Sequence, residues 1–195
     1  DYTDSSAGGA STIQDFIRQH VVGGGDGGAA ADFPTPDENT LYVLYFQASV
    51  TITLDGSASC SSFGAYHNTL TLPDKNSTPT AVAYAIVPRC DTKEAVTTVS
   101  ASHEIIEAAT DPDIGENQLS YYMLNQLWAV AGGEVGDLCE GFGSSGTTTV
   151  ESTFVVQRSW SNKSAAAGND PCVPIPAREV YFNAAPRQAK IVLPK

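Results

Sequence analysis

Apolar residues recur at helical spacing in two segments of the chain and gather into strand-like runs in three others. Residues 11–22 predict a short amphipathic helix, with Ser11 as a suitable N-cap and a glycine-rich run behind it that ends the helix. The apolar face of this helix is formed by Ile13, Phe16, Ile17 and Val21.

The strand-like segments alternate with segments rich in turn residues. Residues 41–54 and 154–160 are rich in β-branched and aromatic side chains, and the first predicts either one long strand or two adjoining strands. Residues 81–88 form an unbroken apolar run, which predicts a buried strand. Residues 60–79 are expected to be loop-like, and the glycine-punctuated residues 132–141 are expected to be irregular.

A second helix is predicted over residues 100–110. The β-branched residues 96–98 weaken its start, and Pro112 ends it because the residue before a proline is disfavoured in helical geometry. Its apolar stripe is formed by Ala101, Ile105, Ala108 and Ala109. The order of helix, strands, second helix and loop predicts an α+β fold.

The second helix carries the most informative motif of the chain, which runs from His103 to Glu107. On a helix these two residues lie one turn apart on the same face, which is the placement of the first two protein ligands in a zinc peptidase. Glu104 would then lie beside the metal-bound water, where a general base is needed. In the usual zinc peptidase motif a histidine occupies the position of Glu107. The alternative interpretation is a partly buried helix whose polar side chains face solvent.

A catalytic zinc normally has a third protein ligand, and we favour the segment 132–141 as its source. The glycines of this segment allow close backbone approach, and Cys139 could hold it in place. Glu134 and Asp137 are equally good candidates. One of them would bind the metal while the other orients His103, unless both are solvated acids of a surface turn.

Five further residues are weaker candidates for the same site. Asp111 and Asp113 follow the helix closely and compete for the third ligand position. His67 could be a ligand or a substrate contact, although a loop histidine more often has a purely structural role. Tyr121 or Tyr122 could stabilise an oxyanion, although tyrosines in an aromatic-rich stretch more often belong to the core.

A glutamate at position 107 changes the expected metal chemistry. Two carboxylates and one imidazole nearly neutralise a divalent ion, which leaves less positive charge to acidify a bound water. Activity is therefore expected to be low near neutral pH and to rise toward alkaline pH. Zinc is the expected cofactor, with calcium or manganese less favoured although oxygen-rich ligation suits them.

Composition narrows the possible partners. The chain has 195 residues and a net charge of −12 with only 10 lysines and arginines, so neither nucleic acid nor an anionic membrane is an expected partner. No apolar run is long enough to span a bilayer. The length suits a single domain over residues 1–195, with a flexible N-terminus at 1–10 and a surface-wrapping tail at 173–195.

The four cysteines predict two disulfides in an oxidising compartment, because their number is even and they form no Cys-x-x-Cys pair. The alternative is four buried thiols in a cytosolic protein. The pairing Cys60–Cys90 and Cys139–Cys172 is preferred, since each bond closes a loop of about thirty residues around a turn-rich segment. With the acidic composition, these bonds predict a secreted protein.

Several of these motifs together resemble a known family. SHEIIEAATDP followed by GEVGDLCEG is similar to the Exordium-like, phosphate-induced extracellular proteins of plants and their secreted bacterial and fungal zincin-like relatives. SCSSFGAYHN, AVAYAIVPRC and FVVQRSWSN resemble further segments of that family. The resemblance implies a secreted, disulfide-stabilised zincin-like domain. The residues that match its helix motif and its Glu-x-Gly-Asp-Leu-Cys loop are His103, Glu104, Glu107, Glu134 and Asp137.

Two hypotheses of different classes follow. The first is a secreted, monomeric metal-dependent hydrolase of the zinc peptidase type, whose substrate is a peptide or protein. In this zincin-like fold the metal-binding helix packs on a β-sheet, and Glu104 takes a proton from the water that attacks the substrate. The second is a non-catalytic extracellular protein that binds cell-wall or protein partners and keeps a structural or vestigial metal site. An intact Glu104 favours the first hypothesis, whereas glutamate at position 107 favours the second.

Overall fold

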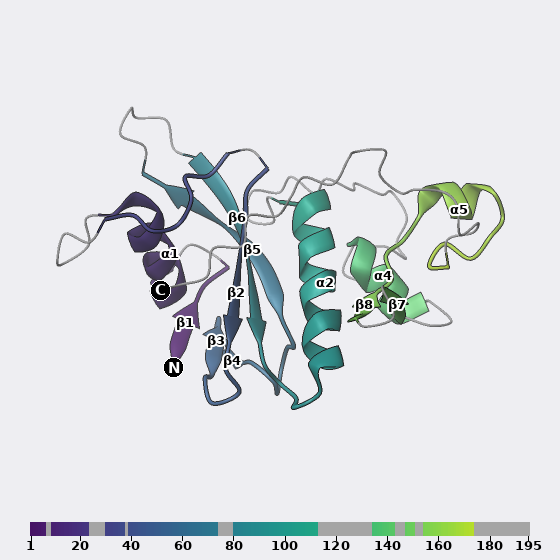
Figure 1. Ribbon diagram of the computed structural model, residues 1–195, viewed down its shortest axis with the longest axis horizontal. Helices are drawn as coiled ribbons and strands as arrows, with labels where there is room; N and C mark the ends of the chain where they lie inside the picture. Colours follow the sequence, from purple (N-terminus) through teal and green to yellow (C-terminus); the bar gives the residue numbers. More distant parts are fainter. Residues whose placement is uncertain are drawn as a thin grey trace.

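The computed structural model of the chain describes residues 1–6, 9–23, 30–37, 39–73, 80–112, 134–142, 147–150 and 154–173. A small central sheet separates helix α1 (Thr12–Val22) from helix α2 (Glu94–Thr110), and Figure 1 shows one helix on each face of it. The described part of the chain is therefore a mixed α+β structure, as the sequence predicts.

The central sheet has the strand order β2-β6-β5. Strand β2 (Leu41–Phe46) runs parallel to β6 (Thr80–Pro88), and β5 (Tyr66–Leu72) runs antiparallel to β6. A second, smaller sheet on the α1 side has the order β1-β3-β4. Its strands are Tyr2–Asp4, Ile52–Leu54 and Ser57–Ala58.

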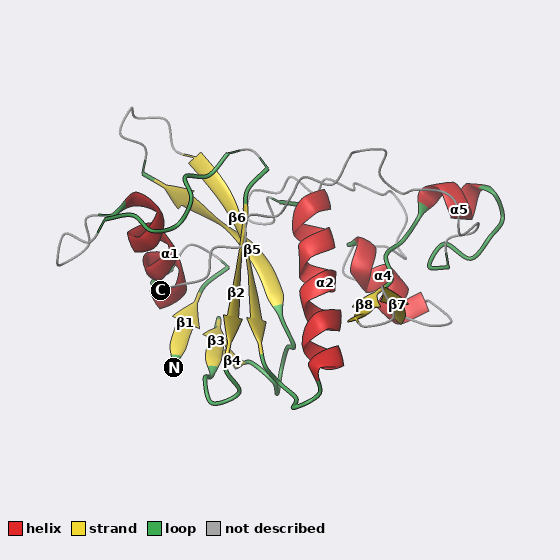
Figure 2. Cartoon of the chain, viewed as in Figure 1, coloured by secondary structure: helices red, strands yellow, loops and turns green. Residues whose placement is uncertain are grey.

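The remaining elements lie beyond α2, on the side away from the central sheet (Figure 2). Helix α4 (Val135–Phe142) and strand β8 (Phe154–Gln157) both contact α2. Strand β7 (Thr147–Val150) pairs antiparallel with β8, and a short helix α5 (Asn162–Ala166) follows. Helix α2 is therefore covered on both sides.

The two faces of β6 carry side chains of different size. Its larger residues point to the α1 side and join the main hydrophobic core, whose strand residues include Val82, Tyr84 and Ile86. The alternate residues Ala83 and Ala85 are also buried and point toward α2, because successive side chains of a strand face opposite ways. The small side chains on this face leave room for polar groups between the sheet and α2.

Several sequence-based expectations are confirmed. Ser11 caps α1 by accepting a hydrogen bond from the Gln14 backbone N–H at 3.0 Å. Helix α2 ends at Thr110, just before Pro112, as predicted. Its start is earlier than predicted, at Glu94, because packing against the sheet and β8 outweighs the weak helix propensity of the β-branched residues in its first turns.

Two expectations are wrong. Residues 60–79 contain strand β5, whose signature is hidden because polar residues occupy buried positions within it. Residues 132–141 contain most of helix α4, whose buried Val135, Leu138 and Cys139 have helical spacing that its glycines conceal. Within the N-terminal segment 1–10, Tyr2–Asp4 form β1, which pairs in parallel with β3.

Other expectations are refined or lie outside the description. The segment 41–54 forms two strands in different sheets, β2 and β3, rather than one long strand. The late strand predicted at 154–160 is shorter and ends at Gln157. The proposed surface-wrapping tail lies outside the described residues beyond position 173.

The predicted cysteine pairing is confirmed. Cys60 is bonded to Cys90 and Cys139 to Cys172, with sequence separations of 30 and 33 residues. The second bond connects α4 to the segment after α5. None of the helices in the described ranges combines the length and apolar character that a membrane span requires.

A buried carboxylate connects the N-terminal strand to the core. Asp4 is only 4% exposed, and its two oxygens accept five hydrogen bonds of 2.7 to 3.0 Å. Burial and the charge of Asp4 raise the pKa of the two tyrosines in this group, so both phenols stay protonated donors. The five donors belong to Ser5, Ser11, Gln14, Tyr66 and Tyr84.

This arrangement predicts that Asp4→Ala strongly destabilises the protein. The substitution removes the shared acceptor of buried donors from α1, β5 and β6, so the free energy of unfolding should fall by about 3 kcal/mol or more. The control is Asp15→Ala, because Asp15 lies on exposed α1 surface and forms a surface ion pair with Arg18. Urea denaturation of both variants measures the difference, and equal stabilities would contradict the role assigned to Asp4.

Candidate metal centre

The buried face of α2 is unusual because it carries acids. Glu104 is 6% exposed and Glu107 2% exposed, whereas Ile105, expected on the apolar stripe, is 41% exposed. Ala101 and Ala108 lie on the same buried face and keep the helix close to the sheet. The cost of burying two carboxylates implies that strong partners compensate them.

Strand β5 supplies the first partner, His67. This residue pairs in register with Ala85 of β6, so its side chain enters the space above the small-residue face of the sheet. Its Nδ1 atom lies 3.1 Å from Glu104 Oε2 and 3.9 Å from Glu107 Oε2. The opposite nitrogen, Nε2, lies 3.3 Å from the backbone carbonyl of Asp111.

The N-terminus of α4 supplies the second partner. One carboxylate oxygen of Glu107, Oε1, accepts hydrogen bonds from the backbone N–H groups of Gly136 and Asp137, both at 3.0 Å. These N–H groups belong to the first turn of α4 and have no acceptor within the helix, so Glu107 caps that helix from outside. The negative charge of Glu107 also interacts favourably with the positive end of the helix dipole. The other oxygen, Oε2, is left to face the histidines.

Helix α4 approaches this closely because residue 136 is glycine. A Cβ atom at position 136 would lie 2.7 Å from Glu107 Oε1 and 2.8 Å from His103 Nδ1, distances that real Cβ atoms essentially never show. The disulfide Cys139–Cys172 and a hydrogen bond from the Gln157 side chain to the Gly136 carbonyl hold the helix in this position.

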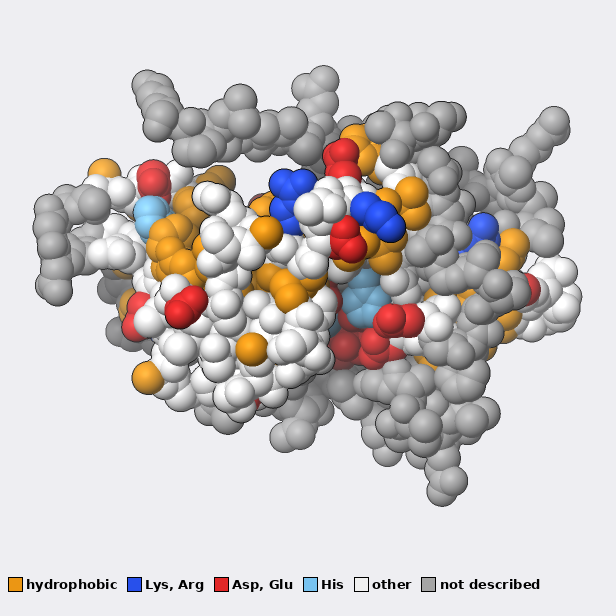
Figure 3. Space-filling model, turned by 90° about the horizontal axis from the view of Figure 1, so that it is seen from below, with side chains coloured by type: hydrophobic (Ala, Val, Ile, Leu, Met, Phe, Trp, Pro, Cys, Tyr) orange, Lys and Arg blue, Asp and Glu red, His pale blue; other side chains and the backbone are white. Residues whose placement is uncertain are grey.

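Three predicted ligands meet on the far side of Glu107. His103 Nε2 lies 2.9 Å from Glu107 Oε2 and 3.5 Å from Asp137 Oδ1. The three donor atoms all lie within 4.8 Å of one another. His103 and Asp137 are partly exposed, and Figure 3 shows histidine and acidic side chains gathered near the centre of one face of the molecule. The group therefore opens to solvent.

Glu134, the other candidate for third ligand, turns to His67 instead. Its Oε1 atom lies 3.1 Å from His67 Nε2, is buried, and makes no well-aligned hydrogen bond to any residue that the structure describes. Asp137 is thus the candidate that shares a group with His103 and Glu107, and Glu134 is not. The sequence left this choice open.

Electrostatics in the centre are dominated by negative charge. Burial lowers the pKa of both histidines, but neighbouring carboxylates outweigh it and raise the pKa of His67 to about 10 and that of His103 to about 9. Burial raises the pKa of Glu104, and burial with the charge of Glu107 raises that of Asp137 to about 6. A site that attracts protons this strongly also attracts cations.

The donor set fits a divalent metal ion. One imidazole nitrogen and two carboxylate oxygens match the ligands that zinc accepts, and a zinc ion with bonds of about 2.0–2.1 Å would place its ligands about 3.3 Å apart in tetrahedral geometry. The distances of 2.9 and 3.5 Å from His103 Nε2 bracket that value. The fixed Oε1 atom of Glu107 would serve as the orienting contact that metal ligands usually have.

The remaining predicted site residues have other positions. Asp111 belongs to neither metal-capable group, and its backbone carbonyl faces His67. Asp113, Tyr121 and Tyr122 lie outside the described residues. The sequence analysis places His67 in a loop, because a strand that carries buried polar residues resembles a loop in its sequence. The structure places it in β5, facing the acids of α2.

Comparisons with known proteins provide no relative for this chain. No family model, no curated protein and no solved structure matches it.

The close approach of α4 predicts that Gly136→Ala is destabilising. The added methyl group must displace Glu107, His103 or α4 itself, and overpacking of this kind costs about 1–3 kcal/mol. Gly64→Ala is a matched control, because a Cβ there would meet its nearest atom at an ordinary 3.6 Å. Thermal denaturation of both variants is the measurement, and a Gly136→Ala protein as stable as Gly64→Ala would contradict the packing described.

Proposed function

We propose that this protein is a secreted metal-dependent hydrolase of the zinc peptidase type, acting on a peptide or protein substrate. The observation that carries the proposal is the meeting of His103 Nε2, Glu107 Oε2 and Asp137 Oδ1 beside the buried carboxylate of Glu104. A donor set with one imidazole, next to a carboxylate outside that set, suits a catalytic centre rather than a closed structural one.

Each residue has a distinct role in this proposal. His103, Glu107 and Asp137 would hold zinc, which when bound lowers the pKa of water and polarises a carbonyl. Glu104 would accept the proton of the attacking water and return it to the leaving amine. Its burial raises its pKa toward the working range of a general base, and the contact of Oε2 with His67 fixes its orientation.

The proposed fold family and location rest on further observations. A metal-capable helix packed on a sheet with an antiparallel edge strand supports a zincin-like assignment, and the sequence motifs support a relationship to the Exordium-like proteins. The two disulfides support an oxidising compartment and hence secretion. The peptidase assignment requires that a substrate carbonyl can reach the open side formed by His103 and Asp137.

One observation favours the alternative, a non-catalytic extracellular binding protein. Glu104 is buried and contacts the buried His67. In the alternative function, the role of its carboxylate is to neutralise that histidine. In that case the metal centre would be structural or vestigial. The two functions differ in whether replacing Glu104 affects any reaction.

The assignment of the third ligand predicts different effects for two neighbouring acids. Asp137→Ala should weaken the tightest zinc-binding event at least 100-fold, because it removes a direct ligand. Glu134→Ala should weaken it less than about tenfold, at the lower end of the effect of outer contacts. Competition titration with a zinc-binding dye on chelator-stripped protein gives both affinities. The opposite order would show that Glu134 is the ligand.

The proposed base predicts that Glu104→Gln retains the tightest zinc ion and loses hydrolysis by at least 10²-fold, the usual contribution of a general base. Glu94→Gln is the control, since Glu94 lies exposed in the first turn of the same helix. Both variants and the wild type would be incubated with a peptide library from neutral to alkaline pH. If the zinc-loaded wild type cleaves nothing that Glu104→Gln leaves intact, the binding-protein alternative is supported.

A further inference from the structure

We propose that the centre has a second cation site, formed by His67 Nδ1, Glu104 and Glu107, and that a cation bound there inhibits the hydrolase. The binding part of this inference stands on the geometry alone. The inhibitory part rests on the proposed function, because it requires Glu104 to be the base.

The first argument is that one ion cannot use both histidines. Two sets of donors can each gather around a cation, His67 with Glu104 and Glu107, and His103 with Glu107 and Asp137. Neither set contains both histidines, although each histidine lies near the same Glu107 oxygen. Two ligands of one zinc ion lie at most about 4.2 Å apart, twice the bond length, so the histidines serve separate positions.

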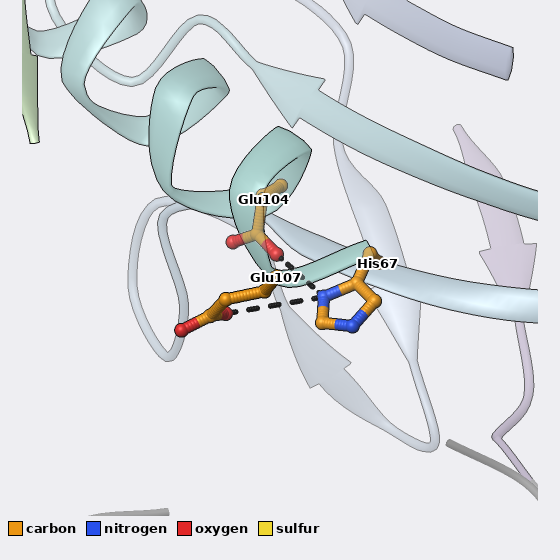
Figure 4. Close-up of side chains that lie close together, drawn as sticks. All are labelled: His67, Glu104 and Glu107. Atoms are coloured by element: carbon orange, nitrogen blue, oxygen red, sulfur yellow. Dashed lines mark hydrogen bonds and ion pairs between the residues drawn. The ribbon is translucent and has the colours of Figure 1, made fainter. Parts of the chain in front are cut away.

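The second argument is the orientation of the His67 ring. Figure 4 shows the carboxylates of Glu104 and Glu107 directed at the same ring nitrogen, Nδ1. The other nitrogen, Nε2, faces the Asp111 carbonyl at 3.3 Å, which can accept its proton, and lies 3.1 Å from Glu134 Oε1. A cation that replaces the proton on Nδ1 would leave His67 donating through Nε2 to a carbonyl, which is the state that metal-ligating histidines adopt.

Distances and burial are consistent with a second ion. The separations of 3.1 Å and 3.9 Å from His67 Nδ1 to the two carboxylates lie on either side of the about 3.3 Å expected between ligands of a tetrahedral zinc. The side chains of His67 and Glu107 are each only 2% exposed, and that of Glu104 is 7% exposed. The donor atoms of this buried set lie within 4.8 Å of one another, which places them around a common position for an ion.

Glu107 is the residue that would join the two sites. Its Oε1 atom is already engaged by two backbone N–H groups of α4, so Oε2 alone faces both histidines. A shared carboxylate oxygen is a suitable bridge for two ions about 3.5–4 Å apart, the spacing of two-metal centres. The anchoring of Oε1 therefore places Oε2 between the two donor sets, 2.9 Å from His103 Nε2 and 3.9 Å from His67 Nδ1.

The charge balance can accommodate a second divalent ion once the histidines are neutral ligands. Four carboxylates surround the two histidines, those of Glu104, Glu107, Glu134 and Asp137. With neutral histidines, one divalent cation compensates two of these charges and leaves two, whereas a second cation compensates all four. Buried charges need such compensation.

Occupation of the second site would remove the base. A Glu104 carboxylate that binds a cation is no longer free to accept a proton from water, so hydrolysis should fall as the second ion binds. Because the first set lacks Glu104, the first ion can remain in place. The protein would therefore respond to cation concentration, being active with one ion and inhibited with two.

The three histidines of the chain allow a direct test. Chelator-stripped wild type and the variants His67→Gln, His103→Gln and His20→Gln would be titrated with zinc chloride by calorimetry, with stoichiometry checked by native mass spectrometry. His20 lies on α1, away from the centre, and pairs with Asp32, so it serves as the control. Glu104→Gln is a second variant for the proposed site, and circular dichroism checks the fold of each protein.

Wild type and His20→Gln should bind two zinc ions, the second more weakly. His67→Gln and Glu104→Gln should each lose the weaker ion and keep the tighter one, whereas His103→Gln should lose the tighter one. In a hydrolysis assay, with each protein compared with its own rate at one equivalent of zinc, excess zinc should inhibit wild type, and the activity that His67→Gln retains should not fall further.

Other outcomes separate the two proposals. If wild type binds one ion that His67→Gln retains and His103→Gln loses, the second site is rejected and the proposed hydrolase centre stands. One ion lost in both histidine variants would mean a single shared site and overturn the inference. Two ions without inhibition of measurable hydrolysis would overturn the inhibitory role alone, and no bound zinc would overturn both proposals.

Discussion

The candidate centre depends on one contact, the pair of hydrogen bonds from the first turn of α4 to Glu107 Oε1. The contact satisfies a carboxylate that would otherwise be costly to bury, and it satisfies N–H groups at the start of a helix that would otherwise lack partners. It also fixes which oxygen faces the histidines. Gly136 makes the contact possible, because any side chain there would collide with Glu107 and His103.

The rest of the fold can be understood as support for that contact. Alanines on one face of β6 and on α2 bring the helix near the sheet while leaving space for polar side chains. The disulfide at Cys139 and the contact of α4 with β8 hold α4 against the other side of α2. A helix that buries Glu104 and Glu107 and exposes Ile105 would be poorly stable alone, so its orientation must come from these tertiary contacts.

The sequence predicts those features that leave a local or periodic signal. The α1 helix with its Ser11 cap, the buried strand β6 and the end of α2 follow from apolar spacing and from Ser and Pro preferences. The cysteine pairing follows from loop length. Strand β5 and helix α4 are not predicted by local patterns. In β5 buried polar residues, and in α4 glycines, replace the apolar residues that usually mark a strand or a helix. The choice of Asp137 over Glu134 depends on how the start of α4 is oriented, which no local pattern contains.

Strand β5 connects the Asp4 network to the buried acids of α2. Tyr66 points to the α1 side and donates to Asp4, while the next residue, His67, points to the α2 side and meets Glu104. A slip of one residue in the pairing of β5 with β6 would exchange these two faces and disrupt both groups at once. The Asp4 network therefore does more than attach the N-terminal strand. By fixing the register of β5, it directs His67 toward the acids of α2. The stability of the core and the geometry of the centre are therefore linked.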